Sequence, residues 1–196
     1  MQKIVLASGN EGKLREIQQR LGHKFDFVTQ SEFKLETPAE TGISFLENAF
    51  LKARYVSAKT GLPALADDSG LVVDYLNGDP GIYSARYAGP EAKDEDNNLK
   101  ILRELAQVPQ KSRSAAFHCT MVLIYPQPES SPIICEGIWR GEILTEARGE
   151  NGFGYDPIFQ PEGRYCSSAE LEPEQKNRIS HRGKAMSMLV ERLSKE

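Results

Sequence analysis

The stretch ALADDSGLVVD, residues 64–74, decides how the rest of the sequence is interpreted. It places Asp67 and Asp68, followed by Ser69 and Gly70, between two short apolar runs. This pattern predicts a buried strand that ends, turns through polar residues and starts again. Adjacent carboxylates repel each other, so a cation, an amide donor or solvent must stabilise them. The pair is therefore typical either of a functional site at a strand end or of an acidic turn in water.

Length, charge and cysteine content narrow the class of protein. A chain of 196 residues can bury a full core, in one large domain or in two lobes that share a sheet. The formal net charge of −4 argues against a general nucleic-acid binder, although a local cluster of Lys and Arg can still hold an anionic small ligand. No apolar run approaches the ~20 residues of a membrane span, and the N-terminal run is too short for a signal peptide. Cys119, Cys135 and Cys166 suit neither a disulfide scaffold nor a CxxC metal site, so we expect reduced thiols in a cytoplasmic protein.

The N-terminal segment has the order strand, glycine-containing turn, helix. A strand is predicted over residues 3–7, the turn is SGNEGK at residues 8–13, and the helix has an apolar face and ends at Gly22. Such a turn directs backbone N–H groups and the positive end of the helix toward an anion, and Lys13 adds a charge. The glycine spacing differs from that of a Walker A loop. The turn is thus typical either of a phosphate site or of a tight turn whose lysine points into water.

A second strand is predicted over residues 25–30, and the acidic loop of residues 36–42 follows it. Ser44 and Glu47 have the S-x-x-E spacing of a capping box, which starts a helix that runs to about Lys59. The apolar face expected for this helix contains Leu46, Ala49, Phe50, Ala53 and Val56. Because Glu47 serves the cap, Glu40 on the loop is the better candidate for a site.

The middle of the chain contains fewer chemical signals. Residues 77–81 predict a dense turn, and residues 82–87 are typical of either a pocket lining or an edge strand. Residues 94–106 predict a helix with Leu99, Leu102 and Leu105 on one side. Two long strands, at residues 115–125 and 133–140, predict a hairpin.

The last third carries aromatic and basic groups. The loop of residues 148–157 places glycines beside Phe153, which is typical either of stacking on a base, worth ~1–3 kcal/mol, or of a strand bend packed on the core. Ser180 is a good N-cap, which puts His181 and Arg182 in the first turn of a helix. Cations there oppose the helix dipole, so they indicate either a solvated basic patch or a purpose other than helix stability.

These segments occur together in one order: SGNEGK at 8–13, ETG at 40–42, FLENAFLKA at 45–53, ADDSGL at 66–71, PGIYSARYAG at 80–89, FGYDPIF at 153–159 and SHRGKA at 180–185. The set resembles the non-canonical purine nucleoside triphosphate pyrophosphatases, the inosine triphosphatase family. The resemblance extends from Met1 to the final helix. One departure is Ala39 before Glu40, where the family pattern has a second acid, so Glu40 stands alone.

The resemblance implies a fold and a reaction. The expected fold is α/β, an ITPase-like two-lobed arrangement with a long mixed β-sheet flanked by helices. Residues 1–196 would form one nucleotide pyrophosphatase domain that acts as a homodimer and binds the nucleotide between its lobes. The family converts ITP, dITP and XTP to the monophosphate and pyrophosphate with Mg²⁺. No nucleic-acid or membrane partner is expected.

The resemblance also implies roles for individual residues. Asp68 would be the catalytic acid residue and a metal ligand, with Glu40 as a second metal ligand, and Ser69 would touch the substrate. The triphosphate would be held by Ser8, Gly9, Asn10, Glu11, Gly12 and Lys13. The base end would consist of Phe153, Gly154, Tyr155, Asp156, Lys176, His181 and Arg182, the last three offering donors to a 6-keto oxygen.

Several alternatives remain open at the level of sequence. Asp68 is either the general base or a metal ligand, since a metal-bound carboxylate is a poorer base. Glu47 competes with Glu40 for the second metal position. The protein is alternatively a related nucleotide pyrophosphatase with another base preference, or a nucleotide sensor without catalysis.

Overall fold

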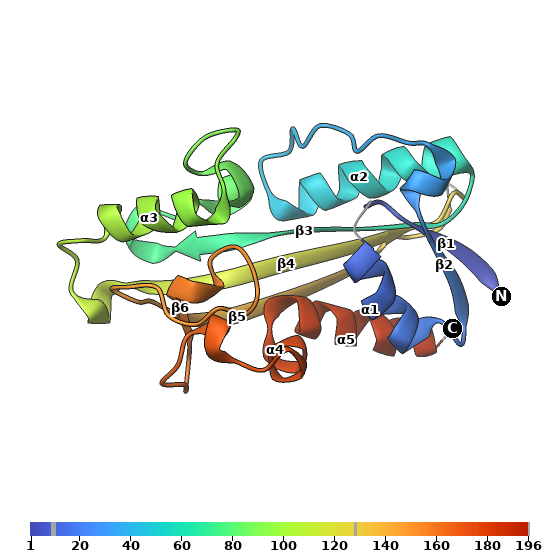
Figure 1. The fold of residues 1–196 in the computed structure, drawn as a ribbon. Helices are drawn as coiled ribbons and strands as arrows, with labels where there is room; N and C mark the ends of the chain where they lie inside the picture. Colours follow the sequence, from blue (N-terminus) through green and yellow to red (C-terminus); the bar gives the residue numbers. More distant parts are fainter. Residues whose placement is uncertain (9–10, 128, 196) are drawn as a thin grey trace. The chain divides into compact units, whose positions relative to one another are not determined.

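The structure, a computed structural model, describes residues 1–8, 11–127 and 129–195, apart from the side chains of residues 11–13 and 16. Its six strands form one sheet in the order β2-β1-β3-β4-β5-β6 (Figure 1). The strands are β1 (Gln2–Leu6), β2 (Phe25–Thr29), β3 (Ala64–Val73), β4 (Ser114–Ile124), β5 (Ile133–Ile143) and β6 (Phe159–Pro161). The helices are α1 (Glu11–Leu21), α2 (Phe45–Thr60), α3 (Asp94–Glu104), α4 (Pro173–Ile179) and α5 (His181–Ser194). The sheet is mixed, because β1 pairs in parallel with β2 and β3 whereas β5 and β6 are antiparallel. The predicted α/β class and mixed sheet are confirmed.

The chain forms two compact units. Unit 1 consists of Met1–Asp68, Thr120–Glu136 and Ala185–Glu196, and unit 2 of Ser69–Cys119 and Gly137–Lys184. Strands β3, β4 and β5 and helix α5 contribute residues to both units. No helix in the described part of the chain is long and apolar enough to cross a membrane.

Unit 1 is built on the parallel pairing of β1 with its two neighbours. Helix α2 starts at Ser44, whose hydroxyl accepts a hydrogen bond from the Glu47 N–H, and ends at Gly61, which has a left-handed φ of 68°. Both ends therefore follow the sequence prediction. Small residues on α2 pack against the strands, and the resulting core contains Val5, Ala7, Val28, Ala49, Ala53, Val56, Ala64, Ala66 and Val122.

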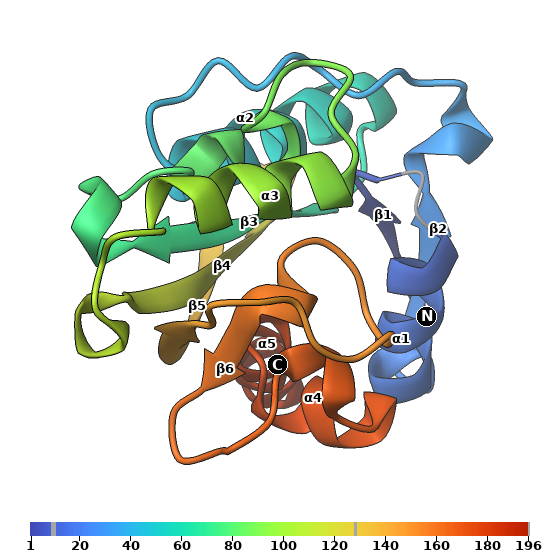
Figure 2. The ribbon, with the colours of Figure 1, turned by 60° about the vertical axis from the view of Figure 1, so that its left-hand side comes forward.

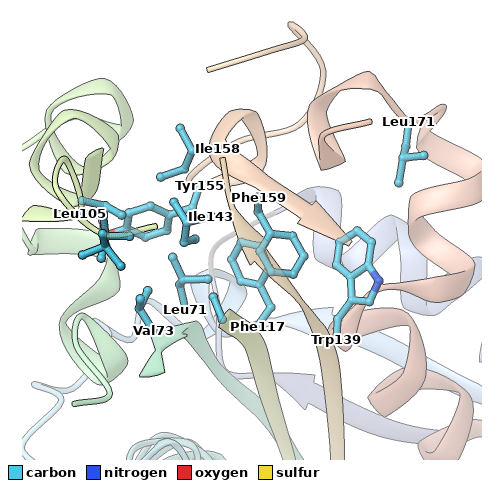
Figure 3. Close-up of a cluster of buried hydrophobic side chains, with 13 residues drawn as sticks. Leu71, Val73, Leu105, Phe117, Trp139, Ile143, Tyr155, Ile158, Phe159 and Leu171 are labelled. Atoms are coloured by element: carbon cyan, nitrogen blue, oxygen red, sulfur yellow. The ribbon is translucent and has the colours of Figure 1, made fainter. Parts of the chain in front are cut away.

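Unit 2 has an aromatic core (Figure 3). The Phe117 ring meets the Phe159 ring edge-on at 4.8 Å between centroids, and Trp139 lies 5.3 Å from Phe159. Leu71, Val73 and Leu105 extend this core toward α3. Helix α3 lies on the β3 side of the unit and α4 on the β6 side (Figure 2). The predicted neighbours β4 and β5 are adjacent in the sheet.

The prediction of two short strands around the Asp67-Asp68 pair is wrong. Residues 64–73 form one continuous strand, and its polar residues do not interrupt it. β3 lies between β1 and β4 in the sheet, so it has a neighbouring strand on each side. Ladder hydrogen bonds involve main-chain groups, and they override the turn preference of Asp, Ser and Gly.

Other expectations about the middle of the chain also need correction. Residues 81–86 form a 3-10 helix, so the edge-strand alternative is wrong. The pocket-lining alternative is confirmed, because Ser84 and Ala85 line a pocket of unit 2. Leu46 is 37% exposed and Leu99 is 48% exposed, although each was expected on a buried face. Polar residues that have specific partners take those faces, namely Asn48 and Lys52 on α2 and Asn97 and Asn98 on α3.

Candidate active site

A cluster of charged side chains in unit 1 surrounds the carboxylate of Asp68 on β3. Asn48 and Lys52, four residues apart on α2, both reach it: Asn48 Nδ2 donates to Asp68 Oδ2 at 3.1 Å, and Lys52 Nζ lies 3.5 Å from Asp68 Oδ1. Lys52 Nζ also lies 2.7 Å from Glu40 Oε1. One helix face thus joins the acidic loop to the strand.

The loop that carries Glu40 is fixed by the same helix. Asn48, which is fully buried, accepts a hydrogen bond from the Gly42 N–H at 2.8 Å. A Cβ at residue 42 would stand 2.7 Å from Asn48 Oδ1, so this approach requires glycine. Glu47 accepts from the Ile43 N–H at 2.9 Å, which confirms its predicted role in the cap.

Burial and neighbouring charges shift the pKa values of Asp68 and Lys52 in this cluster. Burial raises the pKa of Asp68 above its ordinary value, and Lys52 and the Asn48 hydrogen bond offset only part of that effect. Burial lowers the pKa of Lys52, but the attraction of Asp68, Glu40 and Asp67 outweighs it, and the pKa ends above its ordinary value. Three carboxylates therefore act on the ammonium group of Lys52.

The donor set fits a hard divalent cation. Mg²⁺ is usually bound by one or two carboxylates together with water and phosphate oxygens. The described residues contain no group of three or more His, Cys, Asp or Glu side chains arranged to hold a metal. Glu40 and Asp68 both contact Lys52, and their assignment to a metal ion stays a prediction.

Unit 2 contains a pocket of about 170 Å³. Its walls come from the middle of β3 just after Asp68, β4, the 3-10 helix at 81–86, the start of α3, the loop before β6, and α4 with the start of α5. The lining residues are Ser69, Gly70, Ser84, Ala85, Asp94, Asn97, Phe117, Phe153, Gly154, Tyr155, Asp156, Lys176 and His181.

Phe153 gives this pocket an aromatic face with cations beside it. Its side chain is 63% exposed, although it is large and apolar. The ammonium of Lys176 lies 4.7 Å from the ring centroid, and the guanidinium of Arg182 lies 5.8 Å from it. Both cations lie over the ring, and an exposed aromatic side chain with cations nearby suits a flat, polar-edged ligand such as a nucleobase.

Asp156 organises the loop behind Phe153. It is 2% exposed, and it accepts hydrogen bonds from the Phe153 N–H at 2.8 Å and from the Ser168 hydroxyl at 2.8 Å, and it forms an ion pair with Lys176. Gly152 has φ +82°, and a Cβ there would stand 2.1 Å from Asp156 Oδ2. Both the backbone conformation and the close approach therefore require glycine.

His181 lies against the aromatic core. Its ring stacks on Phe117 at 4.7 Å and 10°, and Trp139 is stacked further away at 6.4 Å. The Ser180 hydroxyl accepts from the Gly183 N–H at 3.1 Å, which confirms the predicted N-cap of α5. A Cβ at residue 183 would meet the Asn177 carbonyl oxygen at 1.9 Å, so glycine permits the close contact between α4 and α5.

A family model described as the Ham1 family matches residues 4–192. The chain belongs to the Ham1 family. A protein of Vibrio parahaemolyticus named dITP/XTP pyrophosphatase is 55% identical over 195 residues, which cover 99% of this chain and 98% of that protein. A protein of Pseudomonas aeruginosa with the same name is 53% identical over 193 residues, or 98% of each chain.

Solved Ham1 structures have the same fold. The structure of a HAM1 protein from Coxiella burnetii has a TM-score of 0.96 and 47% sequence identity, with 100% of both chains covered. The Ham1 protein of Staphylococcus aureus has a TM-score of 0.92 and 39% identity, with 98% of each chain covered. The resemblance seen in the sequence is confirmed at the level of the family.

The residues predicted for the base end of a Ham1 site are brought together. Six of them line the pocket, as does Ser69, and Arg182 lies over the Phe153 ring. For the triphosphate end, Gly9 and Asn10 fall outside the described residues, and Gly12 is described only by its backbone, as are Glu11 and Lys13, at the start of α1. Ser8 follows β1. These assignments stay predictions.

The sequence analysis did not identify several residues that the fold places in the cluster around Asp68 or in the pocket of unit 2. Asn48 and Lys52 are buried polar residues at i, i+4 on the face of α2 that also carries Ala49 and Ala53. A polar pair that interrupts an apolar face is the signal by which these two residues could have been found, although it does not identify their partners. The pocket linings Ser84, Asp94, Asn97 and Phe117 have no comparable local signal, because the fold alone brings them together.

Proposed function

We propose that the chain hydrolyses non-canonical purine nucleoside triphosphates, such as ITP, dITP and XTP, to the monophosphate and pyrophosphate, and so cleanses the nucleotide pool. The observation that carries the proposal is the pocket of unit 2, where the exposed Phe153 ring is accompanied by Lys176, His181 and Arg182. Membership of the Ham1 family and the names of its relatives support the same reaction. In this account residues 1–196 act as one pyrophosphatase domain.

The base is proposed to lie on Phe153. A 6-keto base presents an acceptor to the donors of Lys176, His181 or Arg182, whereas the 6-amino group of adenine leaves them unpaired. Lys176 is already oriented by Asp156, and His181 by its stack on Phe117. Positions held in this way cost little ordering when the base binds.

The phosphates are proposed to lie at the carboxylate cluster of unit 1 and at residues 8–13. Asp68 and Ser69 are consecutive residues of β3, so one peptide bond joins the cluster to the lining of the pocket. Glu40 and Asp68 would hold Mg²⁺, which neutralises phosphate charge when it is bound. Asp68 either holds that ion or takes the proton of the water that attacks the α-phosphorus, while Asn48 and Lys52 fix the direction of its two oxygens.

The test is a Mg²⁺-dependent assay of ITP, dITP, XTP, GTP and ATP with identification of the products. The proposal predicts pyrophosphate, with ITP, dITP and XTP far ahead of ATP. Faster turnover of another base would indicate a related pyrophosphatase with a different preference. Binding of ITP without any product would indicate a sensor. Arg182→Ala is expected to raise the KM for ITP and to leave the Mg²⁺ dependence unchanged.

We further propose that the enzyme acts as a homodimer in the cytoplasm, with a nucleotide as its partner and neither nucleic acid nor membrane. The family resemblance supports the dimer, and the net charge of −4 is unfavourable for binding a polyanion. Light scattering of the purified protein checks the dimer, because it reports either one chain mass or twice that mass.

A further inference from the structure

The start of helix α3 holds both backbone polar groups of one residue in the pocket wall. Asp94 Oδ2 accepts a hydrogen bond from the Gly154 N–H at 2.6 Å, and Asn98 Nδ2 donates to the Gly154 carbonyl at 3.0 Å. Asp94 and Asn98 are four residues apart, so they share one helix face. Two side chains of α3 therefore bind the N–H and the carbonyl of Gly154, which is far from α3 in the sequence.

Gly154 lies between Phe153 and Tyr155, and all three residues line the pocket. It has φ +61°, in the left-handed region. The Phe153 side chain is 63% exposed, so its own packing contributes little to holding the loop. The hydrogen bonds of α3 add to the constraint from Asp156, which accepts from the Phe153 N–H. Bonds to a charged acceptor such as Asp94 are among the stronger ones in proteins.

The same helix turn fixes a second wall of the pocket. Asn97, next to Asn98, accepts from the Ala88 N–H at 2.7 Å and donates to the Ala85 carbonyl at 3.4 Å. The Tyr155 hydroxyl donates to the Ser84 carbonyl at 2.7 Å, which ties the two walls together. A base in this pocket would therefore contact two walls, residues 84–88 and residues 153–155, and side chains of α3 hydrogen-bond to both walls.

We propose that Asp94 and Asn98 are positioning residues that hold the Gly154 peptide and thereby set Phe153 for the base. The inference rests on the proposed function, because it assumes that the base binds in this pocket. Neither residue is assigned a contact with the reacting phosphates. Their loss therefore weakens binding of the nucleotide, which appears in KM, and leaves the chemical step, kcat, nearly unchanged.

The experiment compares Asp94→Ala, Asp94→Asn and Asn98→Ser with the parent enzyme. Glu95→Ala is the matched control, because Glu95 is an exposed acid in the same first turn of α3. Asp94→Ala is expected to raise the KM for ITP about tenfold, with kcat within about twofold of the parent. Asp94→Asn keeps an oxygen acceptor and is expected to recover most of the loss. Glu95→Ala is expected to behave as the parent.

A second readout follows the Gly154 amide directly, by hydrogen exchange in the ligand-free protein. Asp94→Ala is expected to accelerate this exchange, and Glu95→Ala is not. Unchanged exchange in Asp94→Ala would overturn the anchor. Faster exchange with an unchanged KM, or an equal fall of kcat in Asp94→Ala and Asp94→Asn, would overturn its role in positioning. A parent protein that hydrolyses no purine triphosphate would instead refute the proposed function, while exchange still reports on the anchor.

Discussion

The imidazole of His181 stacks on the phenyl ring of Phe117, with 4.7 Å between the centroids and 10° between the planes. Phe117 belongs to the buried core of unit 2, and it also lines the pocket. One wall of the candidate base site is therefore a direct extension of the core. This relationship leads to a prediction that separates binding from stability.

Phe117→Leu is expected to raise the KM for ITP roughly two- to tenfold, because an aromatic pair is worth about 0.5–1.5 kcal/mol beyond its buried area. Phe159→Leu is the matched control, since Phe159 is fully buried in the same cluster and is absent from the pocket lining. Both variants are expected to lower the thermal unfolding midpoint, and only Phe117→Leu changes KM. Equal KM values in the two variants, measured well below the midpoint, would refute a role of the stack in binding.

Asp68→Asn is expected to lose activity and to gain stability. Activity falls by at least ~10²–10⁴-fold if Asp68 is the general base. Because the folded-state pKa of Asp68 lies above its ordinary value, folding binds a proton at this group, and its ionised form costs stability at neutral pH. The stability gain of the variant, measured by thermal unfolding with a chelator present, is largest at neutral pH. It shrinks as the pH falls from the raised folded-state pKa toward the ordinary carboxyl pKa of about 3.9, and below that value it has vanished.

Asp26→Asn is the control for this substitution, because Asp26 lies on β2 with a half-exposed side chain and a 3.7 Å contact to Lys3. It is expected to change stability by no more than about 0.5 kcal/mol and to keep full activity. A destabilised Asp68→Asn at pH 7 would contradict the electrostatic description of the cluster, and near-normal turnover would remove Asp68 from the reaction.

Glu40→Gln is expected to raise the Mg²⁺ concentration that gives half-maximal activity, because it removes one of the two carboxylates available to the ion. Glu36→Gln, an exposed position in the same loop, is expected to leave that concentration unchanged. Titration of activity with Mg²⁺ at saturating ITP measures both. An identical Mg²⁺ dependence in the two variants would mean that Glu40 pairs with Lys52 but does not bind Mg²⁺.

Gly152→Ala is expected to damage the base pocket, since its Cβ would displace Asp156 and stand 3.0 Å from Lys176 Nζ. Gly163→Ala provides the comparison, because Gly163 has φ +74° with open space around it. Both variants carry the strain of a left-handed alanine, about 1–2 kcal/mol, and lower the unfolding midpoint. The KM for ITP is expected to rise in Gly152→Ala only. A comparable rise in Gly163→Ala would show that strain alone accounts for the effect.

Local features of the fold were predictable because local chemistry determines them. The Ser44 cap, the Gly61 terminus and the Ser180 cap each involve residues within a few positions of one another. The continuity of β3 was not predictable, because its polar centre is held by pairing with other strands. The exposure of Leu46 follows from the same cause, since the buried face of α2 is determined by partners elsewhere in the chain.

Site residues that belong to sequence motifs were predictable. Contacts between segments that are far apart in the sequence were not. Phe153, Asp156, Lys176 and His181 were named from motifs, and they share one pocket. The hydrogen bond from Asn48 to Asp68 spans 20 residues, and that from Asn98 to Gly154 spans 56. No periodicity within either segment indicates these pairings. They arise only when α2 and α3 are placed against their partners.

The position of water attack tests the central claim most directly. Hydrolysis of ITP in water enriched in oxygen-18, followed by mass spectrometry of the products, shows which phosphorus the water reaches. The account predicts that the label appears in the monophosphate and that the released pyrophosphate is unlabelled, because the attack is at the α-phosphorus. Label in pyrophosphate, or release of labelled orthophosphate, would place the attack at another phosphorus and contradict the account.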